Sequence, residues 1–227
     1  MDTTVTIVIP VYEMEGWENF MKRSLATINA QTYKEYNVVI VDNSEGDNIH
    51  EFCKKYSGRD FSKFYYTRHS IKGASSATNS GIKRASGDLI KILHMDDYFS
   101  HQDALKDIVE AFTPTTEWLV TGCLHDDGGI IGRPHQPHYN DDIHTGKNTI
   151  GAPSVLTIRN HGEDTLLFDE KLRWLFDCDY YKRLHVKFGN PSILNNNNVI
   201  IGLHRGQATH LISEECKKEE DNYMKNK

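Results

Sequence analysis

Apolar runs typical of buried strands alternate with amphipathic stretches along the first hundred residues. The expected strands are rich in β-branched and aromatic residues and lie at 4–9, 37–41, 63–67 and 88–93. Between them, apolar residues recur at helical spacing, which predicts helices over 17–28, 49–56 and 77–85. This alternation predicts an α/β fold with a mostly parallel, twisted central sheet flanked by helices.

The pattern changes after residue 100. Further helices are expected at 104–112 and 174–186, and further strands at 117–122, 150–158 and 199–203. Residues 125–149 carry few aliphatic side chains and many Asp, Gly, Pro and His, so an irregular segment is predicted there. The highly charged end predicts a frayed helix or a disordered tail. We therefore expect a single domain over 1–212 and a charged C-terminal tail over 213–227.

Two adjacent carboxylates, Asp96 and Asp97, follow the fourth expected strand. Like charges side by side repel each other, so a bridging cation is one explanation of the pair. A solvated turn is the other, because Asp is common where strands end. Polar residues also end the first two strands, at 10–12 and 42–44, and such strand ends share one edge of a parallel sheet. The pattern predicts a binding site at this edge and leaves the presence of a metal open.

Bulk composition narrows the classes of partner and compartment. The 227 residues carry a net charge of −6, which disfavours nucleic acid as a partner. The four cysteines are far apart and form no C-x-x-C pair, so free thiols in a reducing compartment are expected. Without a signal peptide or an apolar run of about 20 residues, no integral membrane segment is expected and the predicted location is cytoplasmic.

Taken together, several segments resemble family 2 glycosyltransferases of the GT-A fold. In chain order, the matching segments are Ile7–Tyr12, Gln31, Val39–Ser44, Asn79–Ile82, Ala85–Asp88 and Leu93–Asp97. A second block, at 168–170 and 174–183, resembles the acceptor-side motif of that family. The resemblance implies a donor half at about 1–100 and an acceptor half at about 101–212. It also implies that 125–149 forms a lid on the acceptor side.

The activity implied by the resemblance is metal-dependent, inverting sugar transfer from a nucleotide-diphosphate donor, first of all a UDP-sugar, to a hydroxyl acceptor. The acceptor is expected to be a carbohydrate or another hydroxyl compound in surface-glycan biosynthesis. A lipid-linked acceptor would be met peripherally at the inner membrane face. Two alternatives are a sugar nucleotidyltransferase and a non-catalytic nucleotide-sugar-binding module. The first needs a Gly-rich loop after the first strand, where 10–14 has none, and the second needs no catalytic base.

The resemblance assigns roles in donor binding to six residues. Tyr12 is expected to lie against the base, Asp42 to accept a hydrogen bond from base or ribose, and Asp96 to contact ribose or sugar. Two of the six have a structural alternative: Asp42 could close an Asx turn, and Asn79 could serve only the helix and loop. The full donor set is Pro10, Tyr12, Asp42, Asn79, Asp96 and Arg205.

The expected cofactor is Mn²⁺ or Mg²⁺. The resemblance makes Asp97 its main ligand and His204 a further ligand or a diphosphate contact. His94 stands where the family has an acid and is the less favoured third ligand. An imidazole ligand suits Mn²⁺ better than Mg²⁺.

The resemblance also points to the catalytic base. Asp177 is followed six residues later by Arg183, which is the spacing of the family's base, and Asp179 is the runner-up. Phe176 replaces the acid that usually precedes the base, and an apolar neighbour could raise the pKa of Asp177 toward the working range. The structural alternative is a pair of acids that stabilise a helix N-terminus through its dipole.

Overall fold

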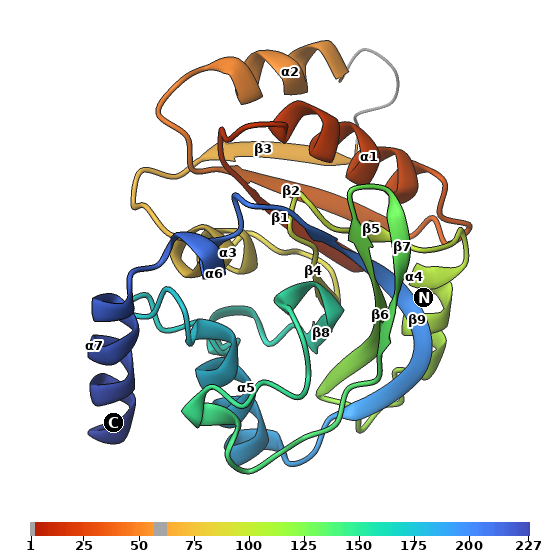
Figure 1. Cartoon of the computed structure of the whole chain (residues 1–227). Coiled ribbons are helices and arrows are strands. Elements are labelled where there is room, and N and C mark those ends of the chain that lie inside the picture. The colour runs from red at the N-terminus through yellow and green to blue at the C-terminus, as the bar shows by residue number, and fades with distance from the viewer. Residues whose placement is uncertain (1–2, 57–62) are drawn as a thin grey trace.

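A curled sheet of nine strands forms the centre of the protein (Figure 1). The computed structural model describes residues 3–56 and 63–227. Along the sheet the strand order is β3-β2-β1-β4-β8-β6-β9-β5, and β7 pairs with β6. The strands are β1 (Val5–Val11), β2 (Tyr36–Asp42), β3 (Phe64–Arg68), β4 (Leu89–Ile92), β5 (Tyr98–Phe99), β6 (Trp118–Asp127), β7 (Ile130–His135), β8 (Leu156–Arg159) and β9 (Ser192–Leu203).

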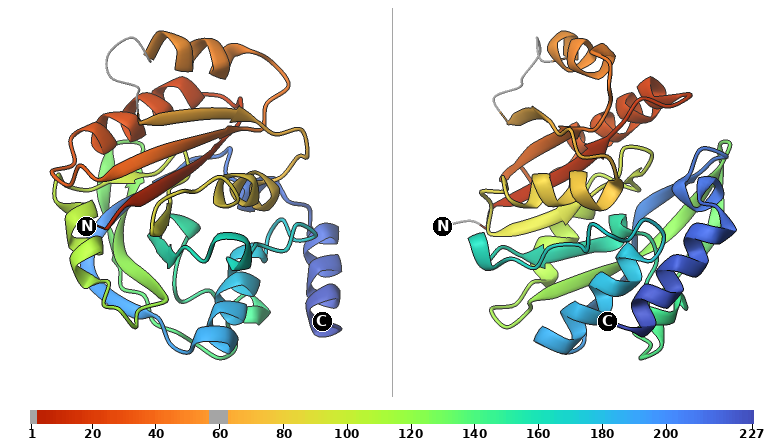
Figure 2. Two further views of the ribbon diagram at one scale, coloured as in Figure 1. Left: turned by 180° about the vertical axis from the view of Figure 1, so that it is seen from behind. Right: turned by 90° about the vertical axis from the view of Figure 1, so that its left-hand side faces the viewer.

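Helices lie on both faces of this sheet (Figure 2). They are α1 (Trp17–Asn29), α2 (Asn48–Tyr56), α3 (Ala74–Ile82), α4 (Ala104–Ala111), α5 (Phe176–Phe188), α6 (Ala208–Leu211) and α7 (Glu214–Lys225). Short 3₁₀ helices occur at η2 (Ile143–Thr145), η3 (Pro153–Val155) and η4 (Gly162–Asp164). The predicted α/β fold class is confirmed, and each of the predicted helices has a counterpart.

The first half of the chain forms the parallel part of the sheet. Strands β3, β2, β1 and β4 pair in parallel, and the register places Val11, Asp42 and Arg68 side by side at one edge. Helix α3 packs closely on this layer, because a Cβ on Gly81 would overlap the side chain of Val8. The strand ends that carry the predicted donor residues therefore meet at one edge of the sheet.

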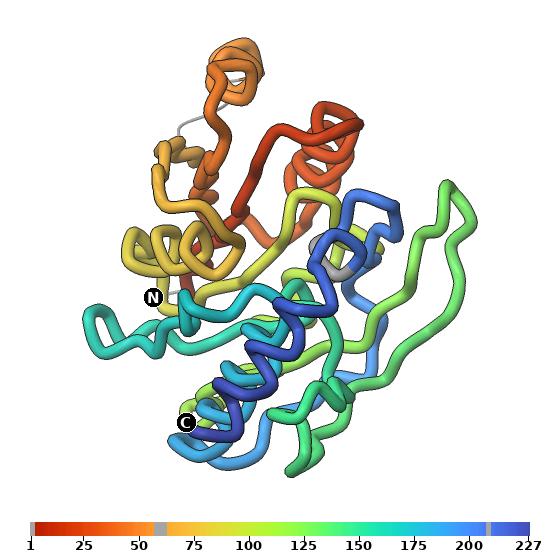
Figure 3. The backbone as a smooth tube through the Cα atoms, turned by 60° about the vertical axis from the view of Figure 1, so that its left-hand side comes forward, coloured from red at the N-terminus to blue at the C-terminus, as the bar shows by residue number. Residues whose placement is uncertain are grey.

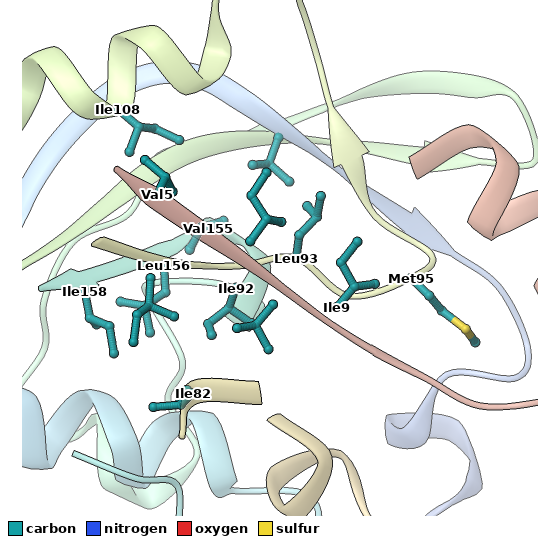
Figure 4. Packing of buried hydrophobic residues seen from close by; sticks show 14 of the residues in the cluster. Val5, Ile9, Ile82, Ile92, Leu93, Met95, Ile108, Val155, Leu156 and Ile158 are labelled. Carbon is teal, nitrogen blue, oxygen red and sulfur yellow. The ribbon is translucent and has the colours of Figure 1, made fainter. Parts of the chain in front are cut away.

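Beyond β4 the sheet is mixed. Strand β8 runs antiparallel to β4 and β6, while β9 runs parallel to β6 and antiparallel to β5. Figure 4 shows buried side chains packed around β1, β4 and η3, among them Ile9, Ile92, Leu93 and Val155. This packing anchors the turn that carries Asp96 and Asp97, since Leu93 and Met95 on either side of His94 are both buried.

Three segments differ from the sequence-based expectation. Residues 125–135 are not irregular: they belong to the β6–β7 hairpin, which turns at Gly128 and Gly129 with positive φ angles of 62° and 96°. The strand expected at 150–158 begins only at Leu156 and is preceded by η3. The C-terminal segment, expected as a frayed helix or a disordered tail, forms helix α7, which lies beside α5 (Figure 3). The highly charged sequence gave no sign that one acid, Glu220, is buried where α7 packs against the rest of the protein.

Among the described residues, none of the helices has the length and apolar character needed to cross a membrane.

Candidate active site

The turn after β4 is fixed from three directions. The backbone N–H of His94 donates to Ser154 Oγ at 2.8 Å. The N–H of Asp97 closes the turn by donating to the His94 carbonyl at 3.0 Å. From α1, the Arg23 guanidinium donates to the Asp96 carbonyl at 2.8 Å. These contacts hold the turn through the backbone of Asp96, while its carboxylate faces His204.

The carboxylate of Asp97 is turned into the protein. It is only 3% exposed and accepts the Gly202 N–H at 2.9 Å, which ties the end of β9 to the turn. Burial and the adjacent Asp96 raise the pKa of Asp97 well above its usual range. Its predicted role as the main metal ligand is untested, and this position favours a structural role instead.

Lys91 lies beneath the same turn, on β4, and is fully buried. Its ammonium donates to the carbonyl of Ser154, and burial lowers its pKa to about 7. Sequence reasoning missed this residue, because a single lysine within an apolar strand looks like an exposed edge position. Asp97, which binds the Gly202 N–H, and Lys91, which binds the Ser154 carbonyl, thus place two buried polar groups below the turn.

Asp96 and His204 face each other across the edge of the sheet. His204 Nε2 lies 2.9 Å from Asp96 Oδ2, and both side chains are partly exposed. The imidazole stacks on the Phe20 ring with centroids 4.8 Å apart. His204 Nδ1 is buried and has no hydrogen-bond partner within the described part of the chain. The structure thus brings together two of the residues that the sequence proposed for donor and metal binding.

This pair offers one oxygen and one nitrogen to a cation. In residues 3–56 and 63–227 there is no cluster of three or more His, Cys, Asp or Glu side chains that would hold a metal by itself. Cations at phosphate-transfer sites are often held by one or two protein ligands, with phosphate oxygens supplying the rest. Asp96 with His204 fits that kind of site, and the imidazole suits Mn²⁺. Burial lowers the pKa of His94, and its Nε2 is buried without a partner in the described structure, so its place as a third ligand stays a prediction.

Tyr12 lies next to this pair. Its ring is 40% exposed, and its hydroxyl donates to the Gly206 carbonyl at 3.2 Å. Burial of the hydroxyl and the charge of Asp96 raise the pKa of Tyr12. Pro10 is buried within β1, and Arg205 is exposed on the turn after β9. Tyr12, Asp96, His204 and the Arg205 backbone therefore border one surface.

Asp42 is fully buried at the end of β2, where the structure shows the Asx turn. One carboxylate oxygen accepts the Ser44 N–H at 2.9 Å, and the other accepts the Tyr66 hydroxyl at 2.6 Å. The Arg68 guanidinium is 3.6 Å from the second oxygen. The predicted contact of Asp42 with the nucleotide remains a prediction. Because the side chain is fully buried and both oxygens already accept hydrogen bonds, little of the carboxylate is left for such a contact.

Asn79 connects α3 to the acceptor-side segment. Its amide nitrogen donates to the Phe168 carbonyl and to Glu170 Oε1, both at 2.9 Å, and its oxygen accepts the Phe168 N–H at 2.8 Å. These bonds engage both ends of the amide. The structural alternative of the sequence analysis fits this arrangement, and a direct donor contact remains untested.

Asp177 lies in the first turn of α5. Asn148 Nδ2 donates to one carboxylate oxygen at 2.8 Å, and the Cys178 N–H donates to the other at 2.7 Å. Burial raises the pKa of Asp177 to about 6, the direction expected from its apolar neighbours. A carboxylate with this pKa is ionised at neutral pH and basic enough to accept a proton.

Asp179 has a different environment. It is 2% exposed and is paired with Arg183 Nε at 2.7 Å and with Lys227 Nζ at 2.6 Å. Arg183, whose spacing pointed to Asp177, therefore pairs with Asp179 one helical turn before it. Each oxygen of the buried Asp179 carboxylate is paired with a cation, so the geometry favours Asp177 as the group open to an acceptor.

Comparison with known proteins identifies the family of the chain. Residues 6–179 match the family model described as glycosyl transferase family 2. The chain belongs to this family. The glycosyltransferase EpsJ of Bacillus subtilis is 30% identical over 81% of the chain, and GlyA of Streptococcus pneumoniae is 31% identical over 48% of it. The chain spans 51% of EpsJ and only 16% of GlyA, so it corresponds to a part of each relative.

Solved structures share the fold of this family 2 chain. S. aureus TarS 1–349 in complex with UDP-GlcNAc superposes with a TM-score of 0.72 at 16% identity, covering 97% of this chain and 65% of that one. The mannosyltransferase PcManGT of Pyrobaculum calidifontis, in complex with GDP-Man and Mn²⁺, gives a TM-score of 0.64 at 14% identity, covering 89% and 57%. At these identities the likeness concerns the fold alone.

Proposed function

We propose that the protein is a metal-dependent, inverting glycosyltransferase that moves a sugar from a nucleotide-diphosphate donor to a hydroxyl acceptor. The observation that carries this proposal is a single short segment, residues 148–154. Asn148 at its start donates to Asp177, and Ser154 at its end accepts the N–H of His94. Six residue steps span at most about 20 Å. A candidate base and a candidate diphosphate site are therefore held by one piece of chain, as sugar transfer requires.

The donor is proposed to be a UDP-sugar bound at the edge formed by β1, β2 and the turn after β4. The exposed ring of Tyr12 suits a nucleobase or ribose, and the exposed Arg205 suits the diphosphate. The solved neighbour TarS binds UDP-GlcNAc, which supports a uridine nucleotide by analogy. Asp96 is the residue proposed to contact the ribose or sugar.

Asp96 and His204 are the residues proposed to hold Mn²⁺ or Mg²⁺. When bound, such a cation supplies the positive charge that stabilises a departing diphosphate. The feature that fits this group is the 2.9 Å approach of His204 Nε2 to Asp96 Oδ2, which brings an imidazole nitrogen and a carboxylate together at a partly exposed place. Mn²⁺ is also the ion bound in the PcManGT complex.

Asp177 is proposed to act as the base. Its carboxylate takes the proton of the acceptor hydroxyl while that oxygen forms a bond to the anomeric carbon. The bond from the anomeric carbon to the diphosphate oxygen breaks on the opposite side, and its electron pair leaves with the nucleoside diphosphate. Attack opposite the leaving group inverts the anomeric configuration. A pKa of about 6 keeps Asp177 ionised at neutral pH.

The acceptor is proposed to be a carbohydrate or another hydroxyl compound of surface-glycan biosynthesis, used in the cytoplasm or at the inner membrane face. The alternative of a nucleotide-sugar-binding module without catalysis is disfavoured by one feature. A binding module has no use for a carboxylate of raised pKa that residues 148–154 connect to the proposed donor site.

A donor screen tests this proposal. The purified chain is incubated with UDP-, GDP-, dTDP- and CMP-sugars, with Mn²⁺ or with EDTA, and released nucleotide is measured. We expect release of UDP only with Mn²⁺ or Mg²⁺, and loss of release in Asp177→Asn while UDP binding is retained. Binding without release for every donor would support the binding module. Formation of UTP and sugar 1-phosphate from UDP-sugar and added pyrophosphate would indicate a nucleotidyltransferase.

A further inference from the structure

Asn148 lies in the irregular segment between β7 and η3 and contacts the proposed base directly. Its oxygen accepts two backbone N–H groups, from Ile150 at 3.0 Å and from Gly151 at 2.9 Å. Its amide nitrogen donates to the Gly151 carbonyl at 3.1 Å and to Asp177 Oδ2 at 2.8 Å. The side chain thus makes four hydrogen bonds, and one of them reaches α5.

These contacts fix which way the amide points. An N–H group needs an acceptor, so the atom that faces Ile150 and Gly151 must be the oxygen of the amide. The NH₂ group then faces the carboxylate of Asp177. If the amide were reversed, donors would meet donors on one side and the oxygen would meet a carboxylate on the other. Asp177 consequently always receives a hydrogen-bond donor from this side.

The loop that carries Asn148 is itself held to α5. The Tyr181 hydroxyl donates to the Gly151 carbonyl at 3.1 Å. Gly151 has a φ of 115°, a conformation that other residues rarely adopt. The loop and the helix therefore form one unit around the carboxylate, and Asn148 cannot easily move away from Asp177.

We propose that Asn148 is a positioning residue that fixes the rotation of the Asp177 carboxylate and leaves its remaining lone pairs directed at the acceptor hydroxyl. Asn148 occupies one lone pair of Oδ2, and the Cys178 N–H occupies one of Oδ1. The inference rests on the proposed role of Asp177 as the base. It adds a residue that neither the sequence motif nor the resemblance assigned.

The geometry predicts how substitutions act. Asn148→Asp preserves the acceptor for Ile150 and Gly151, so the loop is retained, but it places a second carboxylate against Asp177. Like charges favour the protonated form, so the acid limb of the pH–rate profile moves up by at least about one pH unit. Asn148→Ser shortens the side chain and removes the donor to Asp177 without adding charge. We expect Asn148→Ser to lower kcat more than it raises KM for the donor, because the Asp177 carboxylate is no longer held in one orientation.

The test compares these variants with Asn190→Asp, which adds the same charge at an exposed site beyond the end of α5. The assays are the pH dependence of kcat at saturating donor and metal, the donor Kd, and the carboxyl pKa of Asp177 by ¹³C NMR. We expect Asn148→Asp to shift both the profile and the NMR titration, Asn190→Asp to shift neither, and all donor Kd values to stay within about twofold. Asn148→Ser serves as the second variant if Asn148→Asp folds poorly.

Two outcomes separate this inference from the function on which it rests. Turnover that persists in Asp177→Asn would contradict the role of Asp177 as base, whatever Asn148 does. Turnover lost in Asp177→Asn, together with an unchanged pH profile, kcat and NMR pKa in the Asn148 variants, would overturn the role of Asn148 alone.

Discussion

The imidazole Nε2 of His204 lies 2.9 Å from a carboxylate oxygen of Asp96, although 108 positions separate the two residues in the sequence. The contact joins the turn after β4 to the turn after β9. A second link lies beside it, one residue after Asp96 and two residues before His204, where Asp97 accepts the N–H of Gly202. The partly exposed pair Asp96–His204 is thus supported by the neighbouring pair Asp97–Gly202, whose Asp97 is buried.

The contact between Asp96 and His204 lets us predict how mutations change the metal dependence of donor binding. Asp96→Asn and His204→Ala each remove one of the two atoms proposed to hold the cation. We expect Mn²⁺-dependent binding of UDP to weaken by at least about tenfold in each variant, measured by calorimetry with Mn²⁺ and with EDTA. Asp97→Asn serves as the comparison, because its carboxylate faces inward. If Asp97→Asn weakened Mn²⁺-dependent binding as strongly while Asp96→Asn did not, the assignment of the ligand would return to Asp97.

The contact between Asp97 and Gly202 leads to a prediction about the stability of a Gly202 variant. A Cβ added there would lie 2.5 Å from the carbonyl oxygen of Asp96, so the turn or the strand must shift. We expect Gly202→Ala to lower the free energy of unfolding by about 1–3 kcal/mol, measured by urea denaturation. Gly132→Ala on β7 is the matched control, since nothing lies within 4 Å of the Cβ it would add. Equal stability of the two variants would show that the turn after β4 is looser than described.

The sequence predicted the parallel half of the fold because β1, β2 and β4 are buried on both faces. An apolar run such as Val38–Val41 can be recognised as a buried strand from its own residues, without knowing its neighbours in the sheet. The order of these strands then implied that their polar ends would lie at one edge. The β6–β7 hairpin was missed because its strands are half exposed, with Ile130 at 78%, and its turn residues dominate the local composition.

Within the candidate site, local motifs pointed to Asp96, Asp177 and Tyr12 as site residues, but not to the residues that orient them. Arg23, Ser154 and Asn148 act through single hydrogen bonds from distant segments. A one-residue contact of that kind leaves no periodicity or spacing to recognise. The inward orientation of Asp97 was also beyond the sequence, because adjacent residues in a turn can point in opposite directions.

The environment of Asp177 predicts a pH dependence of activity. Its pKa is raised to about 6, so protonation below that pH removes the group proposed to accept the acceptor's proton. We expect kcat to fall with an apparent pKa near 6 on the acid side, measured at saturating donor and metal. A profile that stays flat down to pH 5 would argue against Asp177 as the base.

The raised pKa of Asp177 also affects stability, but in the opposite direction: low pH reduces the expected activity and favours the folded state. A carboxyl whose pKa is 3.8 when unfolded and about 6 when folded favours the folded state most when it is protonated. That contribution is fully present below pH 3.8 and is lost as the pH rises through 6. Asp177→Asn should therefore be more stable than the wild type at pH 8, by about 1–2 kcal/mol, and gain little at pH 4. Thermal melts at the two pH values measure the difference.

Glu220 on α7 holds the backbone that leads into α5. Its carboxylate accepts the N–H groups of Arg173, Trp174 and Leu175 at 2.7–3.2 Å, and it is 5% exposed. Glu220→Gln replaces one acceptor oxygen with an NH₂ group, so at least one buried N–H loses its partner. We expect the free energy of unfolding to fall by about 1–3 kcal/mol, measured by chemical denaturation.

Because this backbone immediately precedes Asp177, we also expect faster amide hydrogen exchange in the first turn of α5 of Glu220→Gln. The control is Glu219→Gln, which removes the same charge from an exposed position on the same helix. It should leave both the stability and the exchange rates unchanged. Loss of stability without faster exchange at 173–177 would place the effect in α7 alone and remove Glu220 from the support of the proposed base.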